Sequence, residues 1–83
     1  MNFYVYLLVS KNNNKIISYV GYTNNLKKRI SLHNSGKGAK FTRGRKWQLI
    51  YKEKYNTKKE AISREYYIKK NKNLRKKIKE SFK

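Results

Sequence analysis

The first two hydrophobic segments of the chain are short and rich in aromatic and β-branched residues. Residues 3–9 read Phe-Tyr-Val-Tyr-Leu-Leu-Val, and residues 16–22 read Ile-Ile-Ser-Tyr-Val-Gly-Tyr. Both compositions are typical of β-strands. Residues 11–15 between them are polar and rich in Asn, which tolerates the backbone of tight turns. The pattern predicts an antiparallel hairpin, and Gly21 near its end indicates a bulge or a close backbone approach.

Three helices are predicted after the hairpin, each from its own start signal. Thr23 is a good N-cap for a first helix, which Asn34-Ser35-Gly36 would end. Residues 57–60, Thr-Lys-Lys-Glu, fit a capping box and predict a helix over 57–70. Asn73 can cap a last helix, in which an apolar residue recurs at every fourth position: Leu74, Ile78 and Phe82.

A third strand completes the predicted set of elements. Large apolar side chains occupy alternate positions at the start of residues 47–54, as Trp47, Leu49 and Tyr51. The order is then β-β-α-β-α-α, and 83 residues suffice for one small domain. We therefore expect residues 1–83 to form a single α+β domain with a basic helical tail, in which helices flank a small three-stranded antiparallel sheet.

The charge of the chain narrows the class of partner. It holds 23 Lys and Arg against 4 acidic residues, a net charge of +19. An electrostatic field that is so strongly positive implies a polyanionic partner. Nucleic acid is the first candidate, and an anionic membrane is the second. The membrane is a poor candidate, because the short helices need their apolar residues for the core. The absence of cysteine excludes disulfides and thiolate sites. With no membrane-length apolar run and no signal segment, we expect an intracellular protein, cytoplasmic or nucleoid-associated.

All four acidic residues are glutamates, so any site for a hard metal must draw on them. Glu60 is engaged by the capping box, whereas Glu65 lies in the middle of the same predicted helix, at the border of its buried face. One carboxylate can hold one Mg²⁺, which keeps several waters and takes other ligands from substrate phosphate. The alternative is that Glu65 pairs with Lys69, one turn later, on a solvated helix face.

Arg29 and His33 lie four residues apart on the first predicted helix and therefore project from one face. Arginine binds phosphate bidentately, and histidine can move a proton near neutral pH. The simpler interpretations are a solvated charge and a favourable cation at a helix C-terminus. Four tyrosines lie on the predicted hairpin: Tyr4, Tyr6, Tyr19 and Tyr22. Their hydroxyls could contact phosphate or water and their rings could stack on bases, or they could simply pack half-buried. A tyrosine acting as a general base would need a pKa below its usual value of about 10, and nearby cations push the pKa in that direction by favouring the phenolate.

Together these segments resemble the GIY-YIG nuclease domain. The resemblance rests first on Tyr4-Val5-Tyr6 and Tyr19-Val20-Gly21, followed by Arg29 and His33 on one helix and Glu65 on a later one. Residues 33–40, 42–45 and 64–70 are similar to the small stand-alone bacterial members, and the match runs from Tyr4 to about Ile78. The first motif lacks a Gly, the second has Val20 in place of Ile, and Phe41 stands where close relatives usually have Tyr.

The resemblance implies a metal-dependent endonuclease that hydrolyses phosphodiester bonds, in structured or branched DNA and in DNA repair, with Mg²⁺ or Mn²⁺ as cofactor and no small-molecule cofactor. It gives catalytic roles to Tyr6, Tyr19, Arg29 and His33, and makes Glu65 the metal ligand. Whether Tyr6, or His33 acting through Tyr6, takes the proton from water stays open. Flanking phosphates would be held by Lys37, Lys40, Arg43, Arg45, Lys69 and Lys70.

The sequence leaves two further binding partners and one alternative function undecided. RNA is an alternative to DNA as the polyanion, and a partner protein is compatible with the chain. The competing class is a module that binds DNA or RNA and keeps the nuclease fold, but hydrolyses nothing.

Overall fold

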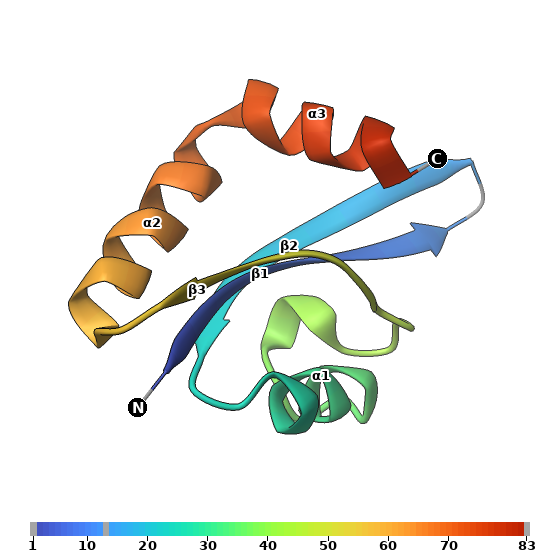
Figure 1. The fold of residues 1–83 in the computed structure, drawn as a ribbon. Coiled ribbons are helices and arrows are strands. Elements are labelled where there is room, and N and C mark those ends of the chain that lie inside the picture. Colours follow the sequence, from blue (N-terminus) through green and yellow to red (C-terminus); the bar gives the residue numbers. More distant parts are fainter. Residues whose placement is uncertain (1, 13, 83) are drawn as a thin grey trace.

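A computed structural model describes residues 2–12 and 14–82 of the chain, and the element order in it is the predicted β-β-α-β-α-α. One antiparallel sheet has the strand order β2-β1-β3 (Figure 1). Its strands are β1 (Phe3–Asn12), β2 (Lys15–Thr23) and β3 (Gln48–Tyr55). The α+β class and the three-stranded antiparallel sheet are therefore confirmed.

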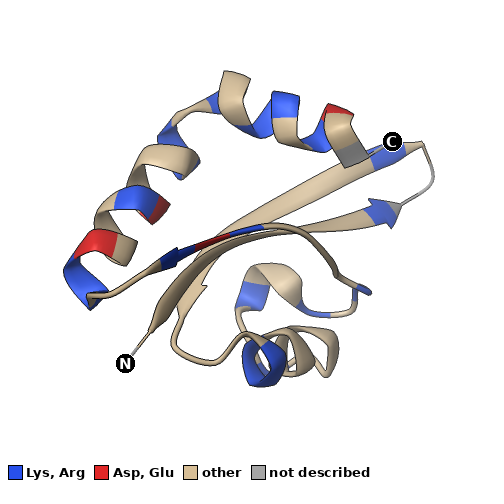
Figure 2. Ribbon diagram, in the orientation of Figure 1, with Lys and Arg blue, Asp and Glu red and all other residues tan. Residues whose placement is uncertain are grey.

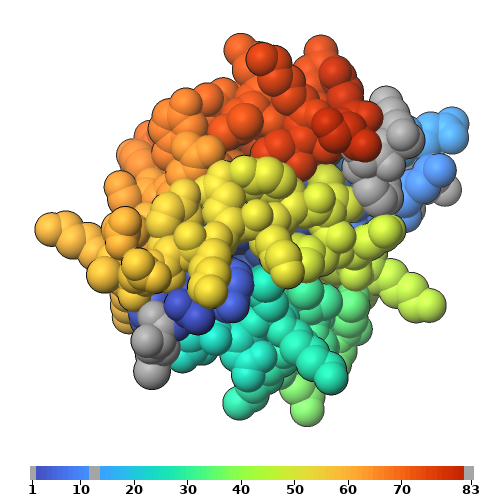
Figure 3. All heavy atoms as spheres, viewed as in Figure 1, coloured from blue at the N-terminus to red at the C-terminus, as the bar shows by residue number. Residues whose placement is uncertain are grey.

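Helices cover both faces of this sheet (Figure 1). Helix α1 (Leu26–Asn34) lies on one face, and α2 (Lys58–Lys70) and α3 (Lys72–Phe82) lie on the other. A short 3-10 helix, η1 (Lys40–Thr42), interrupts the segment between α1 and β3, which the sequence predicts only as a loop. The space-filling view shows β3 as a band between these two helical layers (Figure 3). No helix in the described part of the chain is long and apolar enough to cross a bilayer.

The central strand β1 contributes to two separate cores because its side chains alternate between the faces. Val5, Leu7 and Val9 pack toward α2 and α3, together with Ala61 and Ile68. Tyr6 and Leu8 face the other way and pack with Trp47 under α1. Leu74 and Ile78 join the first core as predicted, whereas the side chain of Phe82 lies outside the described residues. The sheet therefore places Tyr6 on the α1 side.

Three boundaries differ from the sequence prediction. The hairpin turn is tighter than residues 11–15, since β1 continues to Asn12 and β2 begins at Lys15, while Asn13 lies outside the described residues. Thr23 is still paired with Tyr4 in the sheet, so the N-cap of α1 is Asn25, whose side chain accepts from the Lys28 amide at 3.1 Å.

The last helix also begins at a different cap. Its cap is Asn71 in place of the predicted Asn73, because the Asn71 Oδ1 atom accepts from the Leu74 amide at 3.0 Å. Only the start of α2 follows the predicted signal: Thr57 is its N-cap and accepts from the Glu60 amide at 3.2 Å. Asn and Thr are both good N-caps, and the last helix offers two Asn residues, so residue type alone did not separate the candidates.

Candidate functional site

An open cleft of about 530 Å³ lies where the hairpin meets α1 and α2. Four of the residues singled out in the sequence line it: Tyr6, Tyr19, Arg29 and Glu65. Six more residues complete the wall: Phe3, Gly21, Tyr22, Thr23, Asn24 and Lys58. The cleft joins chemistry from both sides of the sheet, because α1 carries Arg29 on one face and α2 carries Glu65 on the other.

Tyr6 reaches the cleft because its partner across the hairpin is a glycine. Tyr6 pairs with Gly21 in the register of β1 and β2. A Cβ atom on Gly21 would lie 2.4 Å from the Tyr6 hydroxyl, so any side chain there would displace the phenol. The close approach expected at Gly21 is thus made by the Tyr6 ring. Tyr19 lies beside it, with the two ring centroids 6.4 Å apart.

His33 stands behind Tyr6 and does not line the cleft itself. The imidazole is fully buried, and its Nε2 atom is 2.9 Å from the Tyr6 hydroxyl. On the other side of the ring, Nδ1 is 2.9 Å from the hydroxyl of Thr42. Arg29, one turn before His33 on α1, lies near enough to the Tyr6 side chain to interact with its hydroxyl, and this interaction raises the pKa of Arg29. The sequence spacing predicted that the Arg29 and His33 side chains lie on one face of the helix. In the structure both side chains approach the Tyr6 hydroxyl.

Burial sets the protonation states of this group. Burial raises the pKa of Tyr6 to about 12, although the nearby guanidinium of Arg29 acts in the opposite direction. Arg29 acts on this pKa in the expected direction, but the desolvation of a phenolate outweighs its attraction to one guanidinium, so the net shift is upward. Burial, helped by the charge of Arg29, lowers the pKa of His33. The pair is a phenol and a neutral imidazole at neutral pH.

Glu65 makes the predicted ion pair with Lys69 and also lines the cleft. Its side chain is 17% exposed and lines the cleft, and its Oε1 atom lies 3.5 Å from Lys69 Nζ. Among the described residues no three His, Asp or Glu side chains come together as a metal cage. A single carboxylate on a polar cleft fits Mg²⁺, which prefers one or two protein carboxylates with water and phosphate as its other ligands.

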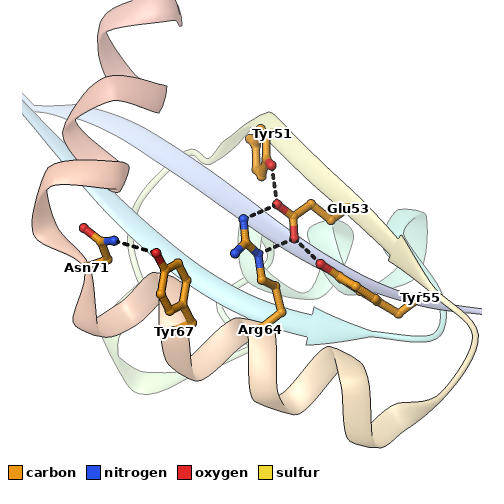
Figure 4. Close-up of polar contacts among 6 residues, drawn as sticks. All are labelled: Tyr51, Glu53, Tyr55, Arg64, Tyr67 and Asn71. Carbon is orange, nitrogen blue, oxygen red and sulfur yellow. Dashed lines mark hydrogen bonds and ion pairs between the residues drawn. The ribbon is translucent and has the colours of Figure 1, made fainter.

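Glu53, the next carboxylate one would consider, is committed elsewhere (Figure 4). Arg64 donates to both of its oxygens, at 2.8 and 3.0 Å, and the hydroxyls of Tyr51 and Tyr55 donate to them as well. Burial alone would raise the pKa of Glu53, but these donors outweigh it and lower the pKa to about 2. Four donor groups leave little room for a metal, so Glu53 is a structural residue that ties β3 to α2.

This network predicts an acid-sensitive contribution to stability. Because the pKa of Glu53 is lower in the folded protein, its stabilisation is complete above the ordinary value of 4.5 and is lost as the pH falls toward 2. The lost free energy of unfolding should be at most about 3 kcal/mol. Urea unfolding at pH 5, 3.5 and 2 measures it. Glu53→Gln should flatten this dependence, whereas exposed Glu80→Gln should not; equal curves for Glu53→Gln and wild type would contradict the assignment.

The predicted phosphate-binding residues are spread over two regions (Figure 2). Arg43 and Arg45 line a second hollow of about 340 Å³ with Lys11 and Lys46, while Lys37 and Lys40 are exposed on the same loop. On α2, Lys69 is paired with Glu65, and Lys70 lies over the ring of Tyr66 at 5.0 Å. Of the predicted phosphate-binding residues, those on the loop have no carboxylate partner within the described part of the chain, whereas Lys69 has one.

The residues that surround His33 were missed by sequence reasoning. They are Gly38, Thr42 and the link between Asn34 and Trp47. Lys58 and Asn24 at the rim of the cleft were missed too. A Thr in a loop gives no local sequence signal for a contact with a helix nine residues earlier, so only the tertiary structure could identify it.

Fold and cleft together define a small basic α+β domain whose polar cleft joins two tyrosines, an arginine and a glutamate. The sequence model of the GIY-YIG catalytic domain matches residues 2–79. The chain therefore belongs to the GIY-YIG family, a family of nuclease domains. Membership of this family implies that the substrate is a nucleic acid.

Proteins of similar sequence occur in several bacteria. The chain is 56% identical over 68 residues to the UPF0213 protein CPE1444 of Clostridium perfringens, covering 81% of this chain and 70% of that one. It is 47% identical over 70 residues to the UPF0213 protein YazA of Bacillus subtilis, covering 83% and 68% of the two chains. The solution NMR structure of the UPF0213 protein BH0048 from Bacillus halodurans aligns with a TM-score of 0.55 at 40% identity, over 100% of this chain and 86% of that one.

Proposed function

We propose that the protein is a metal-dependent endonuclease that hydrolyses phosphodiester bonds in DNA. The observation that carries this proposal is the Tyr6 hydroxyl, which is bonded to a buried neutral imidazole and lies on the wall that also presents Arg29 and Glu65. Hydrolysis needs a proton acceptor for water, a cation for the phosphate and a ligand for a metal ion, and this cleft offers all three.

The proton path follows from the protonation states. A phenol whose pKa is about 12 is a poor base by itself at neutral pH. As the oxygen of water bonds to phosphorus, Tyr6 takes the water proton and passes its own proton to His33 Nε2. The bond from phosphorus to the leaving oxygen breaks at the same time. His33, acting through Tyr6, is therefore the base in this mechanism, and Tyr19 orients the water or the phosphate from the neighbouring wall.

The charged groups act on the phosphate. Arg29 donates to the non-bridging oxygens, where negative charge accumulates in the transition state. Glu65 would hold a Mg²⁺ ion, with Mn²⁺ as the alternative, and the chemistry this ion supplies is polarisation of the phosphate and stabilisation of the leaving oxygen. Lys69, paired with Glu65 at 3.5 Å, would turn to a phosphate once the carboxylate takes a metal.

The substrate we propose is structured or branched DNA, and cleavage of a defined panel tests it. Purified protein is incubated with linear, flapped and branched DNA in Mg²⁺, and in EDTA as the control. Metal-dependent cutting, fastest on flapped or branched forms, is expected. Equal cutting of linear duplex would overturn the proposed preference for structure but not the nuclease activity. An RNA panel of the same shapes separates DNA from the RNA alternative.

Binding should depend steeply on salt, because phosphate contacts supply it. If about five cations of the loop and tail engage phosphates, the slope of log K against log salt should be about −4.5 for duplex DNA. The combined change Arg43→Ala and Arg45→Ala should reduce the slope by about 2, at about 0.9 per contact. Fluorescence anisotropy between low and physiological salt measures both. A nearly flat affinity would show that the +19 charge is not the source of binding.

A further inference from the structure

The hydroxyl of Thr42 is buried next to His33 and has three polar neighbours. Thr42 is 0% exposed, and its Oγ1 atom lies 2.9 Å from His33 Nδ1. The same oxygen is 2.9 Å from the Ala39 carbonyl oxygen and 3.2 Å from the Ala39 amide nitrogen. None of the described buried side-chain polar atoms lacks a hydrogen-bond partner. Such a site can be treated as a complete count of protons and lone pairs.

That count decides which nitrogen of His33 carries the proton. The Ala39 amide can only donate to Thr42, and the Ala39 carbonyl can only accept. When the single hydroxyl proton points to the carbonyl, the oxygen keeps one lone pair for the amide and one for a proton on His33 Nδ1. Nε2 is then unprotonated and accepts from the Tyr6 hydroxyl at 2.9 Å.

The opposite arrangement conflicts with the Ala39 carbonyl. If Thr42 donated to Nδ1, its hydroxyl would have no second proton for the Ala39 carbonyl oxygen, and the proton of His33 would lie on Nε2. The two oxygens, 2.9 Å apart, would then face each other with lone pairs only. Their separation is instead that of a hydroxyl that donates to a carbonyl.

We propose that Thr42 is a positioning residue, which holds His33 in the tautomer protonated at Nδ1 so that Nε2 can accept the Tyr6 proton. The role in catalysis rests on the proposed nuclease function, whereas the tautomer itself does not. In this arrangement the Tyr6 hydroxyl donates to Nε2 on one side of the ring, and on the other side Nδ1 donates to Thr42, which donates to the Ala39 carbonyl.

The loop that carries Thr42 is fastened so that this contact is fixed. The indole of Trp47 donates to the Thr42 carbonyl at 2.9 Å. Asn34, at the end of α1, pairs with the backbone of Trp47 in both directions, at 3.2 and 2.6 Å. Gly38 packs against the imidazole so closely that a Cβ atom there would lie 2.3 Å from Nδ1. Both ends of the loop are thus tied to the helix that carries His33.

Nitrogen-15 NMR of the imidazole tests the tautomer directly. His33 is the only histidine in the chain, so its ring signals need no assignment by mutation. Near pH 8 the neutral ring dominates. We expect Nδ1 of the wild type to have the shift of a protonated ring nitrogen, and Nε2 that of an unprotonated one. A wild-type spectrum with the proton on Nε2 would overturn the proposal, whatever the activity.

Two variants then separate positioning from packing. Thr42→Val keeps the shape but removes the hydroxyl, and we expect a shift toward the Nε2-protonated form with cleavage slower by about 10²-fold. Thr42→Ser keeps the hydroxyl and should restore both the wild-type nitrogen shifts and most of the rate. DNA affinity should be unchanged in both.

The outcomes of these variants remain distinguishable from a failure of the proposed function. A Thr42→Val protein that keeps the wild-type nitrogen shifts would contradict the role of Thr42. If Thr42→Val does not fold, the wild-type spectrum and Thr42→Ser still decide the question. If the wild type cleaves no DNA, the nuclease proposal fails, while the nitrogen shifts still test the tautomer.

Discussion

Glu65→Gln should abolish cleavage while leaving DNA binding intact. The substitution keeps the size and hydrogen-bonding capacity of the side chain but removes the charge that a Mg²⁺ ligand needs. Loss of the metal's stabilisation of the transition state, worth several kcal/mol, should slow the reaction by at least about 10³-fold. Affinity should be equal or slightly higher, because a negative charge near phosphate is gone and Lys69 is released from its pair. Single-turnover cleavage and anisotropy measure the two quantities on one preparation.

A matched control makes this result specific to the cleft. Glu80→Gln removes the same charge from an exposed position on α3, and its rate should equal that of the wild type. If Glu65→Gln cleaved like the wild type, the ligand assignment would be wrong. Glu53 could not replace it, because Arg64 and two tyrosines already fill its oxygens.

Arg29→Ala should lose both rate and affinity. Its guanidinium contacts Tyr6 and lines the cleft, so it can bind phosphate in the ground state and more strongly in the transition state. Removing one such donor costs about 10²–10³-fold in rate. We expect DNA affinity to fall by about tenfold or less, which is about 1.4 kcal/mol. The same single-turnover and anisotropy measurements separate the two losses.

Lys28→Ala is the control for charge alone. Lys28 is the exposed neighbour of Arg29 on α1, and its loss removes one positive charge without changing the cleft. It should lower affinity slightly and leave the rate at saturating protein unchanged. Equal rate losses in Arg29→Ala and Lys28→Ala would show that Arg29 acts only through net charge.

The fold could be predicted because each element carries a local signal. The two aromatic runs of the hairpin, the alternation after Trp47 and the capping box at Thr57 correspond to β1, β2, β3 and α2. The helix starts were mispredicted where two nearby residues could both serve as the N-cap. Asn25 caps α1 in place of Thr23, and Asn71 caps α3 in place of Asn73. A cap depends on where the preceding strand or helix ends, and that is set by tertiary pairing.

The candidate site could be predicted as a set of residues but not as a network. Spacing placed Arg29 and His33 on one face, and the family resemblance added Tyr6, Tyr19 and Glu65. Burial could not be predicted from spacing, so the cations were identified as lowering the pKa of Tyr6, but not the larger opposing effect of desolvation. The contact between Thr42 and His33 arises from the closed loop between α1 and β3, which no short sequence pattern encodes.

The central claim, that this domain cuts the DNA it binds, is tested most directly on a preformed complex. Wild-type protein is bound to flapped DNA in EDTA, the complex is verified by anisotropy, and excess Mg²⁺ is then added to the same tube. We expect a complete complex with intact DNA before the metal and cleaved DNA after it. A complex that forms while every DNA strand stays intact in Mg²⁺, and again in Mn²⁺, would contradict the nuclease account and establish the binding module in its place.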